Sequence, residues 1–500
     1  MYNIVCKMAY MQHLLSLLLL SAAAVPPPRP PLAPDAAFQC AGPCHAFDLD
    51  LATGAYSVSV DAAPWLAAGG VRVRAGGTWR SSAAGGGLLL NASATSVSNG
   101  SSPTLGVFAE AALQWLAADS GAAPVVTRFR CYGDGGALEF ALDYPSGATG
   151  AATSSWPPAE ASEHLNASRA PSALFPLFAA DAASLLGASL GYAESAGDWG
   201  SEDSHLGVGL LNGFVGGQAS GPLLLFDASA GAGSRPPAVL LSGMSNFRST
   251  IFALTDDAVF GAGQQGYLDN IPAGFSQRVL LHSSCAGPAE AAARWGDALQ
   301  REYNTTRLSD ADDLVSSRLS FFTDNGGYYT FGFWNSPSAP KPQQMLPELR
   351  DYHRLAGLPI AVYQLDPYWL PTGSGANGGS PEDWMPRPDF FPQGLEPLAA
   401  SGMRFMLYGA YWALDSPLQT DFSFETSELM TVDFPPHIAR VEAPQSRALH
   451  DELMRRGAAW GMAGMETDWI MRNTQPYTSF QTTVGLYRCH PLTATATHRP

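Results

Sequence analysis

The stretch that decides the fold is residues 343–366, which read QQMLPELRDYHRLAGLPIAVYQLD. Its first part, 343–355, is rich in helix-forming residues and is followed by Gly357, so it predicts a helix that ends at a glycine. Its second part, 359–365, is a short apolar run that predicts a buried strand. Helices are likewise predicted over 394–400 and 446–459, and strands over 319–329, 404–411 and 462–470. Such alternation predicts parallel strands joined by right-handed crossovers.

A β/α barrel and an open doubly wound sheet both fit this alternation. Three of the strands end on an aspartate, at Asp324, Asp366 and Asp468. We favour the barrel, because polar strand-end residues of a barrel converge on one mouth, where its active site lies. Aromatic residues adjoin these positions, namely Tyr328, Tyr329, Tyr368, Trp369 and Trp469. Carboxylates that accept hydrogen bonds from hydroxyls, walled by aromatic faces, predict a sugar-binding pocket.

The strand-end aspartates have a second interpretation, because an aspartate also caps helices and shapes turns. Either reading suits a single aspartate, but three at equivalent positions, each beside an aromatic residue, favour the sugar site. Side chains alternate along a strand, so Gln364 shares a face with Asp366, and Glu466 shares one with Asp468. If the two aspartates point inward, Gln364 and Glu466 lie one layer below them. Glu466 is therefore expected to support the reacting carboxylates rather than to react.

Residues 46–287 have a different pattern of short alternating segments broken by glycine, which predicts a large β-sandwich. Strands are predicted over 56–60 and 71–74, and a hairpin over 126–142 that turns at 133–136. A proline at position 288 opens a stretch of helix formers, so residues 288–315 are expected to form a helical linker. Residues 316–500 then form a partial (β/α)8 TIM barrel of about four β/α units.

The N-terminal 45 residues predict export. Residues 1–25 have a basic start, a short apolar run and small residues, which is the layout of a secretory signal peptide, and 26–45 form a Pro-rich linker. The apolar run is shorter than the ~20 residues of a spanning helix, so we expect no integral membrane segment after signal removal. Four Asn-X-Ser/Thr sequons, at Asn91, Asn99, Asn166 and Asn304, agree with a secreted or lumenal glycoprotein. Five cysteines follow the signal, and their disulfide pairing is open.

Composition narrows the possible partners. The 500 residues carry a formal net charge of −17, with 46% hydrophobic and only 14% charged residues. A chain this acidic lacks the basic surface that nucleic acid requires, whereas a neutral sugar meets no electrostatic objection. The histidines show no metal-ligand spacing, so we expect no metal and no cofactor. The predicted partner is an oligosaccharide or glycoside.

The region 295–470 resembles the α-glycosidase barrels of glycoside hydrolase families 31 and 36, in particular raffinose-synthase-like and α-galactosidase-like members. The resemblance is carried by TDNGGYY (323–329), QLDPYW (364–369), WMPRPDFFPQGL (384–395) and ETDW (466–469). It implies a galactose-mutarotase-like supersandwich before the barrel and a nucleophilic aspartate at the end of the fourth strand, which is Asp468. It also implies that Asp366 binds sugar hydroxyls and that Asp324 lines the same subsite. Pro-Tyr-Trp after Asp366 replaces the Gly-Trp common in family 36, which leaves galactose specificity open.

Two functions follow as expectations. The first is a retaining glycoside hydrolase or transglycosidase that acts on α-linked sugars. Its nucleophile is Asp468, with Asp324, Asp366, Glu466, Tyr368, Trp369 and Trp469 around the substrate. The acid/base of these families comes from a later strand, and residues 316–500 are fewer than the ~250 of a typical barrel. We therefore expect a C-terminally truncated gene model with the acid/base beyond residue 500. The alternative is a non-catalytic or degenerate carbohydrate-binding protein.

Overall fold

The computed structural model of the chain describes residues 37–121, 124–133, 136–155, 171–179, 185–189, 222–227, 235–247, 249–254, 259–323, 340–371, 381–409, 411–426, 438–439 and 443–467. The described residues form two compact units, one up to Thr306 and the other from Arg307 onward. This boundary falls inside the segment 288–315 for which the sequence predicts a helical linker. Each unit is described separately below.

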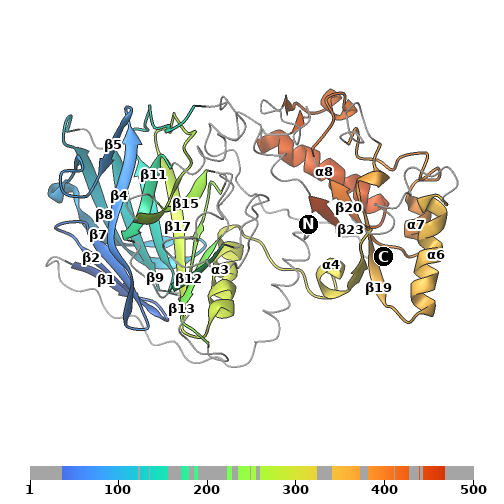
Figure 1. Cartoon of the computed structure of the whole chain (residues 1–500), viewed down its shortest axis with the longest axis horizontal. Coiled ribbons are helices and arrows are strands. Elements are labelled where there is room, and N and C mark those ends of the chain that lie inside the picture. The colour runs from blue at the N-terminus through green and yellow to red at the C-terminus, as the bar shows by residue number, and fades with distance from the viewer. Residues whose placement is uncertain are drawn as a thin grey trace. The chain divides into compact units, whose positions relative to one another are not determined.

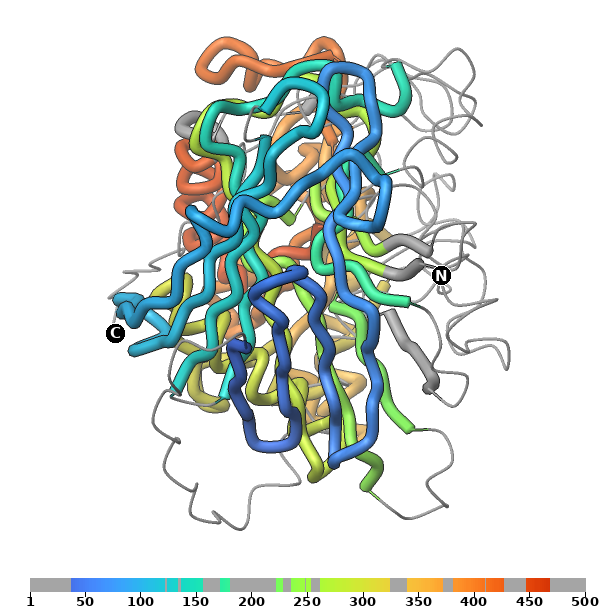
Figure 2. Tube along the Cα trace, turned by 90° about the vertical axis from the view of Figure 1, so that its left-hand side faces the viewer, coloured from blue at the N-terminus to red at the C-terminus, as the bar shows by residue number. Residues whose placement is uncertain are grey.

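The first unit contains two large antiparallel sheets (Figure 1). One sheet has the order β1-β2-β3-β4-β11-β16-β15, with β5 beside β4. Its strands are β1 (Ala37–Ala41), β2 (His45–Asp50), β3 (Tyr56–Val60), β4 (Ala63–Ala75), β5 (Thr78–Ser81), β11 (Ala173–Ala179), β15 (Thr250–Leu254) and β16 (Val259–Gln264). In Figure 2 the N-terminal strands of this sheet, in blue, run up and down beside one another, as consecutive antiparallel strands do.

The other sheet has the order β12-β13-β14-β17-β10-β9-β8-β6, with β7 paired to β8. Its strands are β6 (Leu88–Leu90), β7 (Ser96–Ser102), β8 (Gly106–Ala117), β9 (Val125–Tyr132), β10 (Leu138–Tyr144), β12 (Leu185–Ser189), β13 (Leu223–Asp227), β14 (Ala238–Gly243) and β17 (Phe275–Ser284). The short helix η1 (Ala92–Ala94) lies between β6 and β7. The predicted hairpin is present, because Leu138 pairs with Cys131 and Leu142 with Thr127.

Aromatic side chains fill the core between the sheets. Phe47 of β2 stacks on Phe129 of β9 with ring centroids 5.4 Å apart, and Tyr56 of β3 meets Phe129 edge-on at 5.0 Å. The hydroxyl of Tyr56 makes two hydrogen bonds within this apolar core. It donates to the carbonyl oxygen of Gly70 at 2.7 Å and accepts from the backbone N–H of Leu177 at 2.8 Å. Burial raises the pKa of Tyr56, so the phenol stays neutral and holds β4 to β11.

Two disulfides join strands that are distant in sequence, and they resolve the pairing that the sequence left open. Cys40 of β1 bonds Cys131 of β9, with Cα atoms 6.2 Å apart, and Cys44 bonds Cys285 after β17, with Cα atoms 5.3 Å apart. The first strand spans Ala37–Ala41, so the sheet begins within the segment 26–45 for which the sequence predicts a Pro-rich linker. The Cys40–Cys131 bond and the burial of Phe38 fix this strand against the core.

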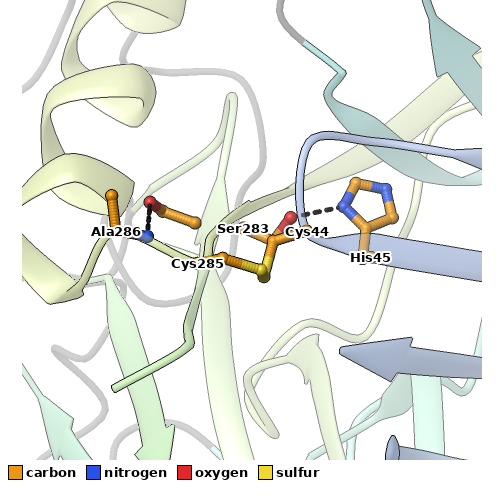
Figure 3. Close-up of a disulfide and its surroundings, with 6 residues drawn as sticks. Cys44, His45, Ser283, Cys285 and Ala286 are labelled. Carbon is orange, nitrogen blue, oxygen red and sulfur yellow. Dashed lines mark hydrogen bonds between the residues drawn. A yellow bond between two sulfur atoms is a disulfide. The ribbon is translucent and has the colours of Figure 1, made fainter. Parts of the chain in front are cut away.

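Two buried histidines lie near the Cys44–Cys285 disulfide. Nδ1 of His45 is 2.7 Å from the hydroxyl of Ser283, next to the disulfide in Figure 3. His282, the preceding residue on β17, is 1% exposed. Burial lowers the pKa of His45 to about 4. Burial lowers the pKa of His282 to about 3, with further contributions from His45, Arg294 and Arg301. Both imidazoles are therefore neutral in the folded protein above pH 5.

The buried histidines predict that acid destabilises the sandwich unit. In the unfolded chain an imidazole titrates near pH ~6.5, so as pH falls below that value the unfolded state binds protons that the folded state does not. The contribution of these two neutral imidazoles to the free energy of unfolding is therefore fully present above pH ~6.5 and is lost as the pH falls toward 4. Between pH 7 and 5 the loss should be about 2 kcal/mol per imidazole, measured by urea unfolding. His282→Leu should show a smaller loss. An unchanged loss in His282→Leu would contradict this assignment.

Helix α3 (Pro288–Glu302) packs on β14 and β17, as its buried residues Ala291 and Ala298 require. The sequence predicted this helix and its proline at the first turn. Beneath its C-terminal end a row of charges crosses the sheet. Arg278 of β17 contacts Glu302 of α3 at 2.6 Å and Glu139 of β10 at 2.8 Å. Arg130 of β9 continues the row from Glu139 at 2.9 Å to Glu110 of β8 at 2.6 Å. The alternating signs hold neighbouring strands together and attach the helix to them.

The second unit contains a four-stranded parallel sheet in the order β18-β19-β20-β23. Its strands are β18 (Leu319–Phe321), β19 (Ile360–Leu365), β20 (Phe405–Gly409) and β23 (Met462–Thr467). The helices of this unit are α4 (Leu314–Ser317), α6 (Pro342–Leu355), η2 (Pro367–Trp369), α7 (Glu396–Ala400), η3 (Pro417–Thr420) and α8 (Ala443–Ala459), and β21 (Glu425–Thr426) pairs with β22 (Ile438–Ala439). The predicted parallel pairing is confirmed. No helix in the described part of the chain is long and apolar enough to cross a membrane.

Each strand of the parallel sheet lies beside the strand that precedes it in sequence. A doubly wound sheet instead reverses direction at a switch point, where its ligand binds. The observed order has no such reversal within β18–β23. Gly357 and Gly402 follow α6 and α7 and have φ of 72° and 89°. A glycine with positive φ ends a helix, so the chain can turn toward the next strand after each of these residues.

Candidate active site

The parallel sheet has two chemically different faces. Tyr363 and Leu365 of β19 point toward the helices, where the hydroxyl of Tyr363 lies 3.1 Å from Nδ1 of His353 on α6. Because side chains alternate along a strand, Gln364 and Asp366 lie on the opposite face. These two residues are polar yet 0% and 3% exposed. The face turned away from α6 therefore carries buried polar groups.

Gln364 joins the two carboxylates of this face. Its Nε2 donates to Oδ1 of Asp366 at 3.0 Å and to Oε2 of Glu466 at 2.7 Å. Glu466 comes from β23, so the contact spans the intervening strand β20. The sequence had placed Gln364 and Glu466 in one layer by strand alternation, and the structure brings them into direct contact. Both carboxylate oxygens that face Gln364 act as hydrogen-bond acceptors.

Thr323 fixes the orientation of the Gln364 amide. Its backbone N–H donates to Oε1 of Gln364 at 2.9 Å, and its hydroxyl donates to Oε1 at 3.1 Å and to the backbone oxygen of Gln364 at 3.0 Å. A backbone N–H can only donate, so the atom that it contacts is the amide oxygen. The amide nitrogen must then face the carboxylates. This chain of contacts links the end of β18 to β19 and β23.

Asp366 does not cap the helix that follows it. It occupies the N-terminal position before η2, but its side chain makes no capping hydrogen bond. Its Oδ1 instead accepts from Gln364. For Asp366 the capping interpretation is therefore wrong. The other strand-end aspartates, Asp324 and Asp468, lie outside the described residues, as do Tyr328, Tyr329 and Trp469.

The two aromatic residues that follow Asp366 are buried. Trp369 is fully buried, with its ring edge-on to Trp384 at 4.9 Å and to Trp460 at 5.8 Å. Its Nε1 donates to the backbone oxygen of Tyr408 at 3.1 Å. The large apolar ring anchors η2 beneath the strand ends, and a role of Trp369 at the wall of a sugar pocket stays a prediction. Tyr368 is also buried, at 3% exposed, with its ring 6.3 Å from that of Phe390.

The segment 384–395 supports the same strand ends. The N–H of Arg387 donates to the backbone oxygen of Trp369 at 2.8 Å. Its guanidinium binds both carboxylate oxygens of Asp389, at 2.7 and 2.6 Å, and lies 4.1 Å from the ring centre of Phe390. The Arg387 guanidinium holds the pKa of Asp389 below its usual value. The backbone of Arg387 thus holds η2, while its side chain binds Asp389 and Phe390 within the motif.

Gln364 is the residue whose linking role the sequence analysis does not predict. It was placed on the inner face but was given no role of its own, and Thr323 was noted only as part of a motif. The available signal was an amide in the middle of an otherwise apolar strand, two residues before a strand-end aspartate. A buried amide must find partners for both its N–H groups and its oxygen, which makes it a natural link between carboxylates.

Comparisons with known proteins give structural neighbours only. No protein-family model matches the sequence, and no curated protein matches it. The α-N-acetylgalactosaminidase NagBb from Bifidobacterium bifidum aligns over 84% of this chain and 68% of its own, with 13% identity and a TM-score of 0.42. A glycoside hydrolase family 97 enzyme from Pseudoalteromonas sp. strain K8 aligns over 75% and 54%, with 10% identity and a TM-score of 0.42.

A β-arabinopyranosidase aligns over 75% of this chain and 56% of its own, with 11% identity and a TM-score of 0.38. The chain therefore spans about half the length of this protein and of the family 97 enzyme. At these TM-scores the alignments assign neither family nor substrate, so the function is argued from the residues of the chain itself. These three similar solved structures are glycoside hydrolases.

Proposed function

We propose that the chain is a retaining glycoside hydrolase or transglycosidase that acts on α-linked sugars, with Asp468 as its nucleophile. The observation that carries the proposal is the bridge of Gln364 between Asp366 and Glu466 on the face of the parallel sheet turned away from α6. Polar groups at the C-terminal ends of parallel strands are where barrel enzymes bind their substrates. Asp468 follows Glu466 by two residues, so strand alternation assigns both to one face.

The proposed chemistry proceeds through a covalent intermediate. The carboxylate of Asp468 attacks the anomeric carbon, the bond to the leaving oxygen breaks, and a carboxylic acid protonates that oxygen. Water or another sugar then displaces the enzyme from the anomeric carbon. Asp366 and Asp324 accept hydrogen bonds from sugar hydroxyls, with Tyr368 and Trp469 beside them. Glu466, one layer below, keeps the amide of Gln364 turned toward Asp366.

The strand order favours a (β/α)8 barrel for the region 316–500. Four parallel strands in sequential order are the arrangement of half a barrel, whereas a doubly wound sheet reverses its order. The described residues of the sandwich unit, with their two disulfides, are compatible with a secreted or lumenal protein. We propose that location for the chain.

Sugar binding tests the site directly. Methyl α-D-galactopyranoside and methyl α-D-glucopyranoside would be titrated into the whole chain by calorimetry. Asp366→Asn should weaken the binding of the recognised glycoside about 10–100-fold, because a carboxylate that accepts hydroxyl hydrogen bonds is replaced by an amide. The exposed Asp421→Asn is the matched control and should bind normally. Equal affinity of the two variants for the glycoside would show that Asp366 does not bind the sugar.

The alternative function is a non-catalytic carbohydrate-binding protein. It shares the polar face formed by Gln364, Asp366 and Glu466 but requires no nucleophile. Sugar binding that depends on Asp366, without any covalent reaction at Asp468, is the result that supports this alternative.

A further inference from the structure

Strand β7 lies at the edge of the nine-stranded sheet. Among the described residues it pairs only with β8, in an unbroken antiparallel register from Ser96 opposite Ala112 to Ser102 opposite Gly106. Five of its seven residues are exposed, including Val97, which is 53% exposed. An edge strand of this kind presents a row of backbone N–H and C=O groups to any other strand that approaches.

The usual protections of an edge strand are absent from β7. Its sequence, SVSNGSS, contains no charged residue and no proline, and its register with β8 contains no bulge. An exposed apolar residue adjoins it, Val107 of β8, which pairs with Ser101 and is 62% exposed. Charge, proline and bulges are the devices by which sheet edges normally avoid pairing with another chain. Some other device must protect this edge.

Asn99 lies in the middle of this strand and begins the sequon Asn99-Gly100-Ser101. Both Asn99 and Ser101 are exposed. Gly100 suits the central position, because a Cβ there would lie 2.5 Å from the ring of Phe108 on β8. The sequon at Asn91 differs, since that residue is half-buried and its Nδ2 donates to Oε1 of Gln114 at 2.7 Å.

We propose that Asn99 carries an N-linked glycan and that this glycan keeps β7 from pairing with another chain. The donor is a lipid-diphosphate-linked oligosaccharide of the secretory pathway. Nδ2 of Asn99 forms a bond to C1 of the first sugar, the bond from C1 to the diphosphate oxygen breaks, and the lipid diphosphate leaves while Nδ2 loses one proton. The hydrated glycan, larger than any side chain, then covers the edge. This role is independent of the sugar-cleaving site.

The first test is peptide mapping of the whole chain secreted from a eukaryotic cell. Peptide-N-glycosidase in ¹⁸O-water converts a glycosylated asparagine into an isotopically marked aspartate. Asn99 should carry this mark in most molecules. An unmarked Asn99 in secreted protein overturns the proposal.

The second test is self-association, measured by light scattering over a range of concentrations. Ser101→Ala removes the sequon and should raise the weight-average mass at least about twofold, while Ser98→Ala, in the same strand but outside the sequon, should stay monomeric. Adding Val97→Lys to Ser101→Ala places a charge on the bare edge and should restore the monomer. If Ser101→Ala is retained in the cell, its secretion should likewise return with Val97→Lys. A monomeric Ser101→Ala, or a defect that Val97→Lys does not correct, overturns the protective role.

Discussion

Replacing Glu139 with alanine should lower the free energy of unfolding of the sandwich unit by about 3–5 kcal/mol. The side chain of Glu139 is fully buried and binds Arg278 through both oxygens, at 2.9 and 2.8 Å. It also accepts from Arg130 at 2.9 Å and from the hydroxyl of Tyr132 at 2.8 Å. Burial alone would raise the pKa of Glu139, but the hydrogen bond and charge of Arg278 outweigh it and lower that pKa. Removing the carboxylate takes away one of the two acidic partners, Glu139 and Glu302, that Arg278 has among the described residues.

An exposed ion pair supplies the control for this prediction. Glu290 and Arg294 lie one turn apart on α3, with a distance of 3.1 Å and side chains 43% and 30% exposed. Glu290→Ala should change the free energy of unfolding by less than about 0.5 kcal/mol, because water screens such pairs. Urea unfolding at pH 7, followed by tryptophan fluorescence, measures both variants. Equal losses of unfolding free energy in the two variants would show that the burial of Glu139 does not strengthen its contribution to stability.

The second large effect is expected for Gln364→Leu. Leucine has a similar size but neither donates nor accepts, so Asp366, Glu466 and the backbone N–H of Thr323 each lose a partner while they remain buried. We expect the free energy of unfolding of the parallel-sheet unit to fall by about 2–4 kcal/mol. The affinity for the recognised methyl glycoside should also fall at least about 10-fold, because Asp366 loses the group that orients it.

The control for Gln364 is Gln344, an exposed glutamine on α6 of the same unit. Gln344→Leu should leave both stability and sugar affinity near those of the parent protein. Gln364→Glu is a companion variant that keeps the size but places a third carboxylate beside two others. It should bind sugar no better than Gln364→Leu, and stronger binding would refute the orienting role of the amide.

Local periodicity was sufficient to predict the parallel strands with their main helices and a few strands of the sandwich. The parallel strands and their helices follow from apolar runs that alternate with helix formers, and the β9–β10 hairpin follows from a glycine-rich turn between alternating segments. The start of α3 could also be predicted from the sequence, because Pro288 suits the first turn of a helix. These signals lie within a few residues of the elements that they specify.

Contacts between residues distant in sequence could not be predicted from local patterns. The pairing of Cys40 with Cys131 depends on how the two sheets meet, which no local pattern encodes. The meeting of Trp369 with Trp384 and Trp460 likewise joins segments that no local pattern connects. The link from Gln364 to Glu466 crosses 102 residues, and alternation could place both on a layer but could not join them.

The measurement that tests the central claim most directly is covalent labelling of Asp468 by activated α-glycosyl fluorides of galacto and gluco configuration, bearing a further fluorine on the sugar ring. Fluoride leaves with little help from an acid, so the reaction reports on the nucleophile alone, and the ring fluorine slows release of the sugar. The account predicts that intact mass rises by one glycosyl group, that the group maps to the peptide containing Asp468, and that Asp468→Asn abolishes it. Glycoside binding without labelling, or a label on another residue, would contradict the account.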